Sequence, residues 1–170
     1  MANHRIGVWL IGAKGGVAST TILGLIALKR GMIGSVGLVT ALPEFRNLEM
    51  ADWRDFVVGG HEIRRDPLAS GVLRMIDDLQ SHHPDLFANC REELDAIERR
   101  IRPGTTYNVG ATIAGLADLE IPRDASARQT VERLQSDLQE FQETSGVERV
   151  VVVNVASTEP TDANEELPAT

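Results

Sequence analysis

Residues 6–31 have the pattern of a buried strand, a glycine-rich turn and a helix. The apolar run from Ile6 to Ile11 is typical of a strand, and Gly31 is a typical helix stop. Between them, apolar side chains recur at helical spacing, mostly on one face: Val17, Ile22, Leu25, Ile26 and Leu28. Backbone N–H groups at the start of such a helix, aided by the helix dipole, point at whatever lies above the turn. The pattern therefore predicts an anion site at this turn.

The turn is similar to the phosphate loop of partition ATPases, in which KGG is followed by a variable residue, Gly, Lys and Thr. In the segment KGGVASTT, Ala18 stands where that Gly would be and Ser19 where the Lys would be. A nucleotide triphosphatase needs this lysine to neutralise charge on the β- and γ-phosphates, and a serine hydroxyl carries no charge. Lys14 matches only the secondary lysine of that loop, so the sequence argues against ATP hydrolysis.

A dinucleotide-binding loop fits the same residues better. Such a loop needs small residues at the tight turn, at the approach of the backbone to pyrophosphate and at the contact between helix and strand. Gly12, Gly15 and Ala18, with Gly16 beside them, supply all three. Because the spacing is G-x-x-G-x-x-A rather than G-x-G-x-x-G, a glycine-rich turn that binds nothing stays open as an alternative.

Composition excludes several functional classes. The 170 residues suffice for one α/β domain with a core, and the net charge is −8, from 25 acidic and 17 basic residues. Without a basic cluster, nucleic acid is not an expected partner. The single cysteine, Cys90, fits a reducing compartment and is expected to be a small buried group on a helix. No apolar run approaches twenty residues, so we expect a soluble, cytoplasmic protein that contacts no membrane.

Further along the chain, strands and helices are expected to alternate, which indicates a doubly wound α/β sheet of parallel strands. A second strand is expected at 36–40, an irregular stretch at 43–54, and an apolar run broken by Gly59 and Gly60 at 55–63. Helices are expected at 66–79, 84–101, 111–119 and 125–144. A β-branched run from Glu148 onwards is typical of a strand buried on both faces.

The helix at 125–144 has the clearest amphipathic pattern. Its apolar residues repeat at three- and four-residue spacing, and Gly146 is expected to end it. The expected apolar face consists of Val131, Leu134, Leu138 and Phe141.

Three segments together resemble the myo-inositol-1-phosphate synthase family, in particular its prokaryotic members. IGVWLIGAKGGVASTT resembles the family's cofactor loop, and VVGGHEI is similar to its GGWDI motif, with His61 for Trp and Glu62 for Asp. VVVVNVASTEP resembles its strand that ends in an A-N-T-E or S-S-T-E segment. The resemblance covers only the N-terminal part of a family member. It implies a Rossmann-like NAD-binding domain at 1–160, incomplete relative to the full family fold, and a polar tail at 161–170.

The resemblance also implies a reaction. In the family, NAD oxidises carbon 5 of glucose 6-phosphate, an enol forms, carbon 6 attacks the carbon-1 aldehyde, and the hydride returns, so this isomerase makes inositol phosphate without net redox change. The complete enzyme is expected to be a homo-oligomer, a tetramer. Its catalytic lysines are expected beyond the point where this chain stops, so no catalytic residue is assigned and the chain alone is expected to be inactive.

The residues implied to hold NAD lie in three places. The loop would cradle the pyrophosphate, an acidic residue would accept hydrogen bonds from the adenosine ribose and favour NAD over NADP, and the segment after the last strand would hold the nicotinamide side. These residues are Gly12, Lys14, Gly15, Gly16, Val17, Ala18, Ser19, Glu62, Ser157, Thr158 and Glu159.

Some of these residues keep two interpretations. Lys14 either reaches phosphate or extends into water, and Glu62 is either the ribose acceptor or a solvated strand-end residue. His61 is expected to pack rather than to act in catalysis. No metal site is expected, because His82 and His83 are adjacent and diverge on a helix. Three functions stay open: part of an NAD-dependent isomerase, a partition-type ATPase, and a noncatalytic dinucleotide-binding module.

Overall fold

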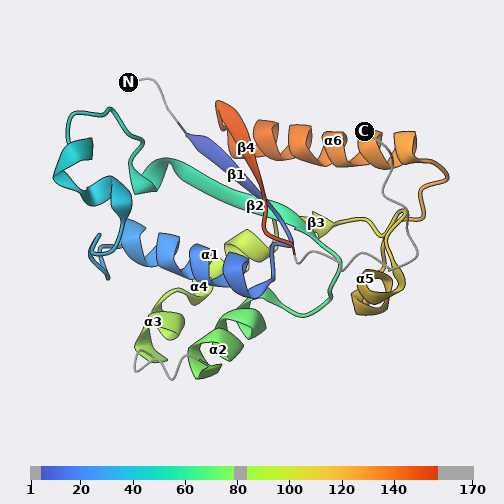
Figure 1. Ribbon diagram of the computed structural model, residues 1–170, viewed down its shortest axis with the longest axis horizontal. Helices are drawn as coiled ribbons and strands as arrows, with labels where there is room; N and C mark the ends of the chain where they lie inside the picture. The colour runs from blue at the N-terminus through green and yellow to red at the C-terminus, as the bar shows by residue number, and fades with distance from the viewer. Residues whose placement is uncertain (1–4, 79–83, 157–170) are drawn as a thin grey trace, which may run out of the picture.

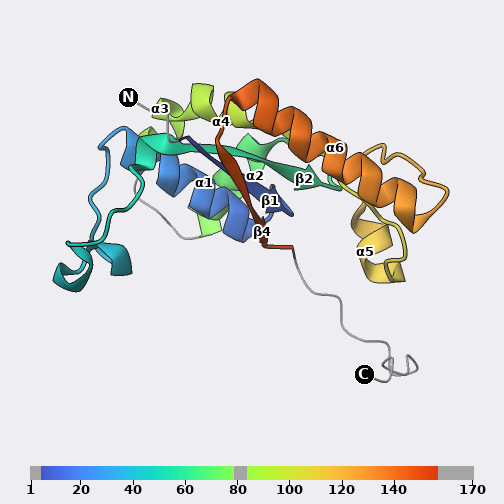
Figure 2. The same cartoon turned by 90° about the horizontal axis from the view of Figure 1, so that it is seen from above.

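The computed structural model describes residues 5–78 and 84–156, which contain a parallel four-stranded sheet between two layers of helices (Figure 1). The strands are β1 (Ile6–Ile11), β2 (Phe56–Glu62), β3 (Ile101–Pro103) and β4 (Arg149–Asn154). The helices are α1 (Gly16–Lys29), α2 (Leu68–Asp78), α3 (Pro84–Asn89), α4 (Arg91–Glu98), α5 (Ala111–Leu116) and α6 (Ala127–Ser145). Short 3-10 turns lie at Val39–Ala41, Pro43–Phe45 and Trp53–Asp55, in the arm that projects between α1 and β2 (Figure 2).

The strand order is β3-β2-β1-β4, so β1 is central and pairs in parallel with β2 on one side and β4 on the other. Successive side chains of a strand point to opposite faces. Leu10 accordingly packs into the larger core with α1, α2 and α4, whereas Trp9 packs on the other face with Phe141 of α6. The expected doubly wound α/β sheet is confirmed.

β2 continues without a break through Gly59 and Gly60. A Cβ atom on Gly60 would overlap the carbonyl oxygen of Leu10, and one on Gly59 would lie 2.9 Å from the Trp9 ring. The sequence suggested that the two glycines interrupt the strand, and this expectation is wrong. They instead let β1 and the Trp9 ring approach β2 closely.

Two expected elements are wrong. The segment 36–40 is not a strand: Gly37 has a φ of 89°, Val36 is 99% exposed, and the backbone then enters a 3-10 turn. The helix expected at 84–101 is two helices, α3 and α4, separated at the buried Cys90, and Ile101 belongs to β3, where it pairs with Gly60. Cys90 is buried, as expected, but it lies between the two helices rather than on one. Burial raises the pKa of its thiol.

The remaining helices are close to their expected positions. α2 and α5 fall within the ranges 66–79 and 111–119. α6 extends one residue beyond the expected 125–144, to Ser145, and Gly146 ends it in the left-handed conformation with a φ of 60°. Val131 is 51% exposed, however, so it does not belong to the buried face of α6. None of the helices in the described part of the chain combines the length and apolar character that a membrane span requires.

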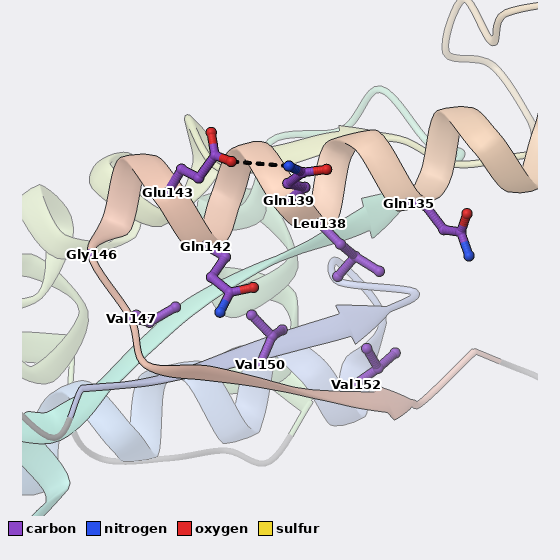
Figure 3. Close-up of a pocket in the computed structure, with 9 residues that line it drawn as sticks. All are labelled: Gln135, Leu138, Gln139, Gln142, Glu143, Gly146, Val147, Val150 and Val152. Carbon is purple, nitrogen blue, oxygen red and sulfur yellow. Dashed lines mark hydrogen bonds between the residues drawn. The ribbon is translucent and has the colours of Figure 1, made fainter.

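β4 is not buried on both faces, contrary to expectation. Val151, Val152 and Val153 are 48%, 51% and 38% exposed. β4 is also an edge strand, since only β1 pairs with it within the described residues. An open groove of about 810 Å³ separates β4 from α6. Figure 3 shows Leu138 of α6 pointing across this groove toward Val150 and Val152. We call this surface the α6/β4 groove.

Candidate cofactor-binding cleft

A second cavity, of about 490 Å³, lies where the carboxyl ends of all four strands meet, and we call it the cofactor cleft. Segments that follow β1, β2, β3 and β4 each contribute to its wall, and α5 and α6 close one side. The chain visits β2 and β3 on one side of β1 and β4 on the other, so the cleft lies at the topological switch point where open α/β sheets bind ligands. Its lining residues are Ile11, Gly12, Gly15, Gly16, Val17, His61, Glu62, Ile63, Arg64, Gly104, Thr105, Val109, Ile113, Leu116, Leu134, Val155 and Ala156.

The glycine loop turns sharply at the end of β1. Gly12 has a φ of 83°, and a Cβ atom there would lie 2.9 Å from the Ala156 backbone. The Gly12 amide donates to the His61 carbonyl at 3.0 Å, and the Gly15 amide donates to the Gly12 carbonyl at 3.0 Å. The loop thus depends on glycine at position 12 for both its turn and its contact with the segment after β4.

The start of α1 is suited to bind an anion. Gly15 caps the helix without a side-chain hydrogen bond, and no acidic side chain occupies the first turn. The amides of Gly16, Val17 and Ala18 have no acceptor within the helix, since they belong to its first turn. A Cβ atom on Gly16 would meet nothing within 4 Å. The open space beside Gly16 therefore fits a phosphate group held by helix amides.

Glu62 ends β2 and is 3% exposed, so it is not the solvated residue that one interpretation required. Its Oε2 accepts from the Lys14 amide at 2.8 Å, and its Oε1 accepts from the Ile63 amide at 2.8 Å. Arg64 adds bonds from Nη2 to Oε2 at 3.1 Å and from Nε to Oε1 at 3.3 Å. Burial alone would raise the pKa of Glu62, but the hydrogen bonds from Arg64, Ile63 and Lys14 outweigh it and hold that pKa below its ordinary value.

Lys14 follows neither of its two interpretations. Its side chain is 8% exposed, and its Nζ lies 2.7 Å from Oε1 of Glu98 on α4. The other oxygen of Glu98 accepts from the Leu68 amide at the start of α2, at 2.7 Å. The Lys14 side chain therefore joins the loop to the helices below the sheet, and it does not line the cofactor cleft.

His61 lies beneath the cleft and packs, as expected. Its ring stands edge-on to Trp9, with centroids 4.8 Å apart, and its Nδ1 accepts from Trp9 Nε1 at 3.0 Å. Nδ1 therefore carries no proton, and Nε2 donates to Oδ2 of Asp137 at 3.0 Å. Burial lowers the pKa of His61, against the opposing effect of Asp137. These contacts hold the ring in one neutral form.

The structure brings five of the residues implied by sequence into the cleft wall: Gly12, Gly15, Gly16, Val17 and Glu62. The side chains of Ala18 and Ser19 are fully buried on the core side of α1, so only their backbone is available to a ligand. Ser157, Thr158 and Glu159 lie outside the described residues.

Sequence reasoning missed the residues that complete the wall. Gly104 and Thr105 follow β3, Ile113 belongs to α5 and Leu134 to α6, and no local motif marks them as a site. Arg64 is adjacent to the GGHEI segment, and the signal that would have found it is its position directly after a strand's carboxyl end.

Comparison with known proteins decides between the loop types. A family model described as myo-inositol-1-phosphate synthase, which represents an NAD-binding domain, matches residues 6–167. The chain belongs to this family. NAD is therefore the cofactor of the domain, and the partition-ATPase interpretation is wrong. The structure gives the physical reason, since Ser19 stands where the ATPase lysine would be and is buried against Gly71 of α2.

Individual relatives agree with this assignment. Inositol-3-phosphate synthase 1 of Bacteroides thetaiotaomicron is 28% identical over 174 residues, which covers 93% of this chain and 38% of that protein. The chain thus spans well under half the length of this curated relative.

Two solved structures share the fold. The inositol-3-phosphate synthase of Caenorhabditis elegans has a TM-score of 0.74 at 19% identity, covering 98% of this chain and 37% of that one. A myo-inositol-1-phosphate synthase-related protein of Thermotoga maritima has a TM-score of 0.52 at 24% identity, covering 92% and 35%. These likenesses confirm a Rossmann-like fold that is only part of a larger one.

Proposed function

We propose that the cofactor cleft binds NAD with its pyrophosphate at the start of α1. We further propose that this chain is the NAD-binding part of an inositol-3-phosphate synthase, which converts D-glucose 6-phosphate to 1D-myo-inositol 3-phosphate. The observation that supports this most is the open space at Gly16, beside the first-turn amides of α1 and between the four strand ends. NAD, when bound, would supply the hydride acceptor and donor that such an isomerisation needs.

In this proposal the chain's own residues bind and enclose the cofactor. Gly16 leaves open space for the pyrophosphate, Gly12 and Gly15 shape the turn beside it, and Glu62, which lines the cleft, is the proposed acceptor for the ribose hydroxyls. Apolar side chains of α5 and α6, such as Ile113 and Leu134, exclude water from the opposite wall. The backbone of Lys14, Ala18 and Ser19 stays a proposed contact, as do Ser157, Thr158 and Glu159.

The sugar chemistry needs more groups than the cleft wall presents, since within the described residues its one cation, Arg64, is paired with Glu62. Enolisation and aldol closure require a positioned cation and a proton shuttle near the sugar. The chain has two lysines: Lys14 pairs with Glu98, and Nζ of Lys29 donates to the Phe56 carbonyl, with its pKa lowered by burial. We therefore propose that the catalytic residues, and the tetramer contacts, come from the part of the family protein that this chain does not cover.

Calorimetry with NAD, NADP and ATP tests the cofactor assignment. We expect NAD to bind more tightly than NADP or ATP, and more tightly to a chain extended by the downstream part of a family member than to the 170-residue chain. Tightest binding by ATP would contradict the proposal.

An assay for inositol phosphate tests the reaction. With NAD and glucose 6-phosphate, we expect no product from the 170-residue chain and turnover from the extended chain. Turnover by the 170-residue chain would place catalytic residues within it, with Lys14 as the first to substitute. NAD binding without turnover by a folded, extended chain would indicate a noncatalytic module.

A further inference from the structure

Within the described residues, the wall of the cofactor cleft contains a single cationic side chain. NAD brings two negative charges on its pyrophosphate, and sequence analysis looked to Lys14 for the compensating charge. Glu98 holds the Lys14 ammonium on the other side of the loop. Among the lining residues in the described part of the chain, only Glu62 and Arg64 carry full charges, because the contacts of His61 keep its ring neutral. Arg64 is therefore the cationic side chain in this wall that is available to a phosphate group.

Arg64 lies beside the part of the loop that approaches a phosphate most closely. A Cβ atom built on Gly15 would lie 3.8 Å from Nη2 of Arg64. Gly15 is the N-cap of α1, so the guanidinium group stands next to the first-turn amides of that helix. The positive end of the helix dipole and the guanidinium charge thus converge on the same space.

The guanidinium group is held in place but keeps free donors. Its bonds to Glu62 use Nε and Nη2, and within the described residues no hydrogen bond engages Nη1. The Arg64 side chain is 37% exposed, whereas Glu62 is 3% exposed. Glu62 is therefore a buried anchor, and Arg64, which lines the cleft, keeps the Nη1 donors of its planar guanidinium group for a further acceptor such as a phosphate oxygen.

We propose that Arg64 is a cofactor-binding residue, which donates hydrogen bonds from its guanidinium group to the pyrophosphate of NAD at the start of α1, with Glu62 holding it in position. This inference rests on the proposed function, because it assumes that the cleft holds a dinucleotide. It assigns to Arg64 the phosphate contact that the sequence suggested for Lys14.

The test compares ligands with and without phosphate. NAD, ADP-ribose and adenosine are titrated into the unsubstituted chain and into Arg64→Gln, with binding followed by NMR so that weak affinities are measurable. We expect Arg64→Gln to weaken the binding of NAD and of ADP-ribose by about ten- to a hundredfold, which is the effect of losing a hydrogen bond to a charged group. The affinity for adenosine should stay unchanged. Raising the salt concentration should weaken ADP-ribose binding more in the unsubstituted chain than in Arg64→Gln.

Two further variants serve as controls. Arg65→Gln removes the same charge from the exposed neighbouring residue and should leave all three affinities unchanged. Arg64→Lys keeps the charge but not the fork and should restore part of the ADP-ribose affinity. A thermal melt of each variant shows that it is folded.

Three outcomes would overturn the inference. Unchanged affinities in folded Arg64→Gln would mean that Arg64 only satisfies Glu62. Equal weakening of adenosine and ADP-ribose would mean that Arg64 acts at the nucleoside rather than at phosphate. Failure of the unsubstituted chain, and of the extended chain, to bind NAD would reject the proposed function, and the assignment of Arg64 with it.

Discussion

Two carboxylates determine where the positive charges around the glycine loop lie. Glu98 holds the Lys14 ammonium below the sheet, and Glu62 holds Arg64 at the cleft while also accepting the Lys14 amide. The loop is thus fixed from both sides by buried or half-buried acids. Because the loop itself has little side-chain volume, we attribute its shape to these contacts and to the backbone hydrogen bonds of Gly12 and Gly15.

Gly16 allows cofactor binding to be tested without disturbing the fold. A Cβ atom there meets nothing within 4 Å in the described part of the protein, but it lies beside the space proposed for pyrophosphate. We expect the Gly16→Val variant to remain folded and to bind NAD at least about tenfold more weakly, since a bound phosphate would have to shift. Gly15 is a less suitable position, because a Cβ atom there would already lie 3.2 Å from the Gly12 carbonyl oxygen. Binding is measured by calorimetry, and folding by circular dichroism.

Gly24 supplies the matched control for this experiment. It lies in the same helix, its Cβ position is also open, and it does not line the cleft. Gly24→Ala should raise the free energy of unfolding by about 0.5–1 kcal/mol, as expected for Gly to Ala within a helix, and leave NAD affinity unchanged. Equal NAD affinity for folded Gly16→Val and for the unsubstituted chain would show that the loop does not contact the cofactor.

His61 should make stability depend on pH. Burial lowers its pKa from the ordinary value of 6.5, so the folded state favours the neutral ring, and unfolding takes up a proton below that value. Stability is therefore fully present above pH 6.5 and falls as the pH drops below it, by at most about 1.4 kcal/mol per pH unit for one proton. Asp137 and Arg133 also face the ring: Asp137 raises the pKa of His61, and Arg133 lowers it.

Denaturant unfolding between pH 5 and 7 measures this dependence. His61→Gln should be less stable at pH 7, because Trp9 and Asp137 lose their partner, and its stability should vary less over this range. Parallel curves for the two proteins would show that His61 does not titrate with unfolding.

At the level of elements, α6 fixes the loop that follows β3. Arg133 donates from Nη2 to Oδ2 of Asp124 at 2.9 Å, and it also donates to the carbonyls of Pro103 and Gly104 at 3.2 and 3.1 Å. These bonds attach the segment with Gly104 and Thr105, one wall of the cleft, to a helix on the opposite face of the sheet from α1. α6 therefore supports the cleft at a distance as well as lining it through Leu134.

Substitution of Arg133 tests this support. Arg133→Ala should lower the free energy of unfolding by about 1–3 kcal/mol, because it leaves partly buried acceptors unpaired, and it should also weaken NAD binding. Arg128→Ala on the same helix is the control, because the Arg128 side chain is 87% exposed. This substitution should change the free energy of unfolding by no more than about 0.5 kcal/mol. Equal effects of the two substitutions would contradict a supporting role for Arg133.

The sequence predicted the elements whose signals are local. The glycine pattern and the helical spacing after it identified the loop and α1, and the amphipathic repeat and Gly146 identified α6. β3 has only three residues, which is too short for a periodic pattern, and the break at Cys90 carries no glycine or proline signal.

The site residues likewise divide into those with a local sequence signal and those without one. The glycines and Glu62 lie in recognisable motifs, whereas the partners of Lys14 and Arg133 depend on tertiary contacts. Lys14 meets Glu98 on α4, and the Arg133 side chain meets the loop after β3. No spacing rule predicts such pairs, because their separation along the chain is set by the intervening elements rather than by a helical or strand period.

For the whole molecule, the strand order has a direct consequence. The order β3-β2-β1-β4 is the first part of the Rossmann order 3-2-1-4-5-6, in which the next strands lie beside β4. Crossovers between parallel strands are right-handed, so a connection that continues outward from β4 places its helix on the same face as α6. That helix would occupy the α6/β4 groove, and its strand would cover the exposed edge of β4 (Figure 3).

We therefore predict that the part of the family protein beyond the matched residues adds a parallel strand to β4 and a helix to the α6/β4 groove. Hydrogen exchange checks this: β4 amides that do not pair with β1 should exchange quickly in the 170-residue chain and become protected in a chain extended by the downstream part of the Bacteroides relative. Val152→Lys should lower the free energy of unfolding several-fold more in the extended chain than in the 170-residue chain. The reason is that the added helix would bury the ammonium group in the extended chain. Val131→Lys is the matched control, since both valines are 51% exposed but Val131 lies outside the groove. Unchanged exchange of β4 in a folded, extended chain, or equal effects of the two lysines, would show that this face of the sheet is covered in another way.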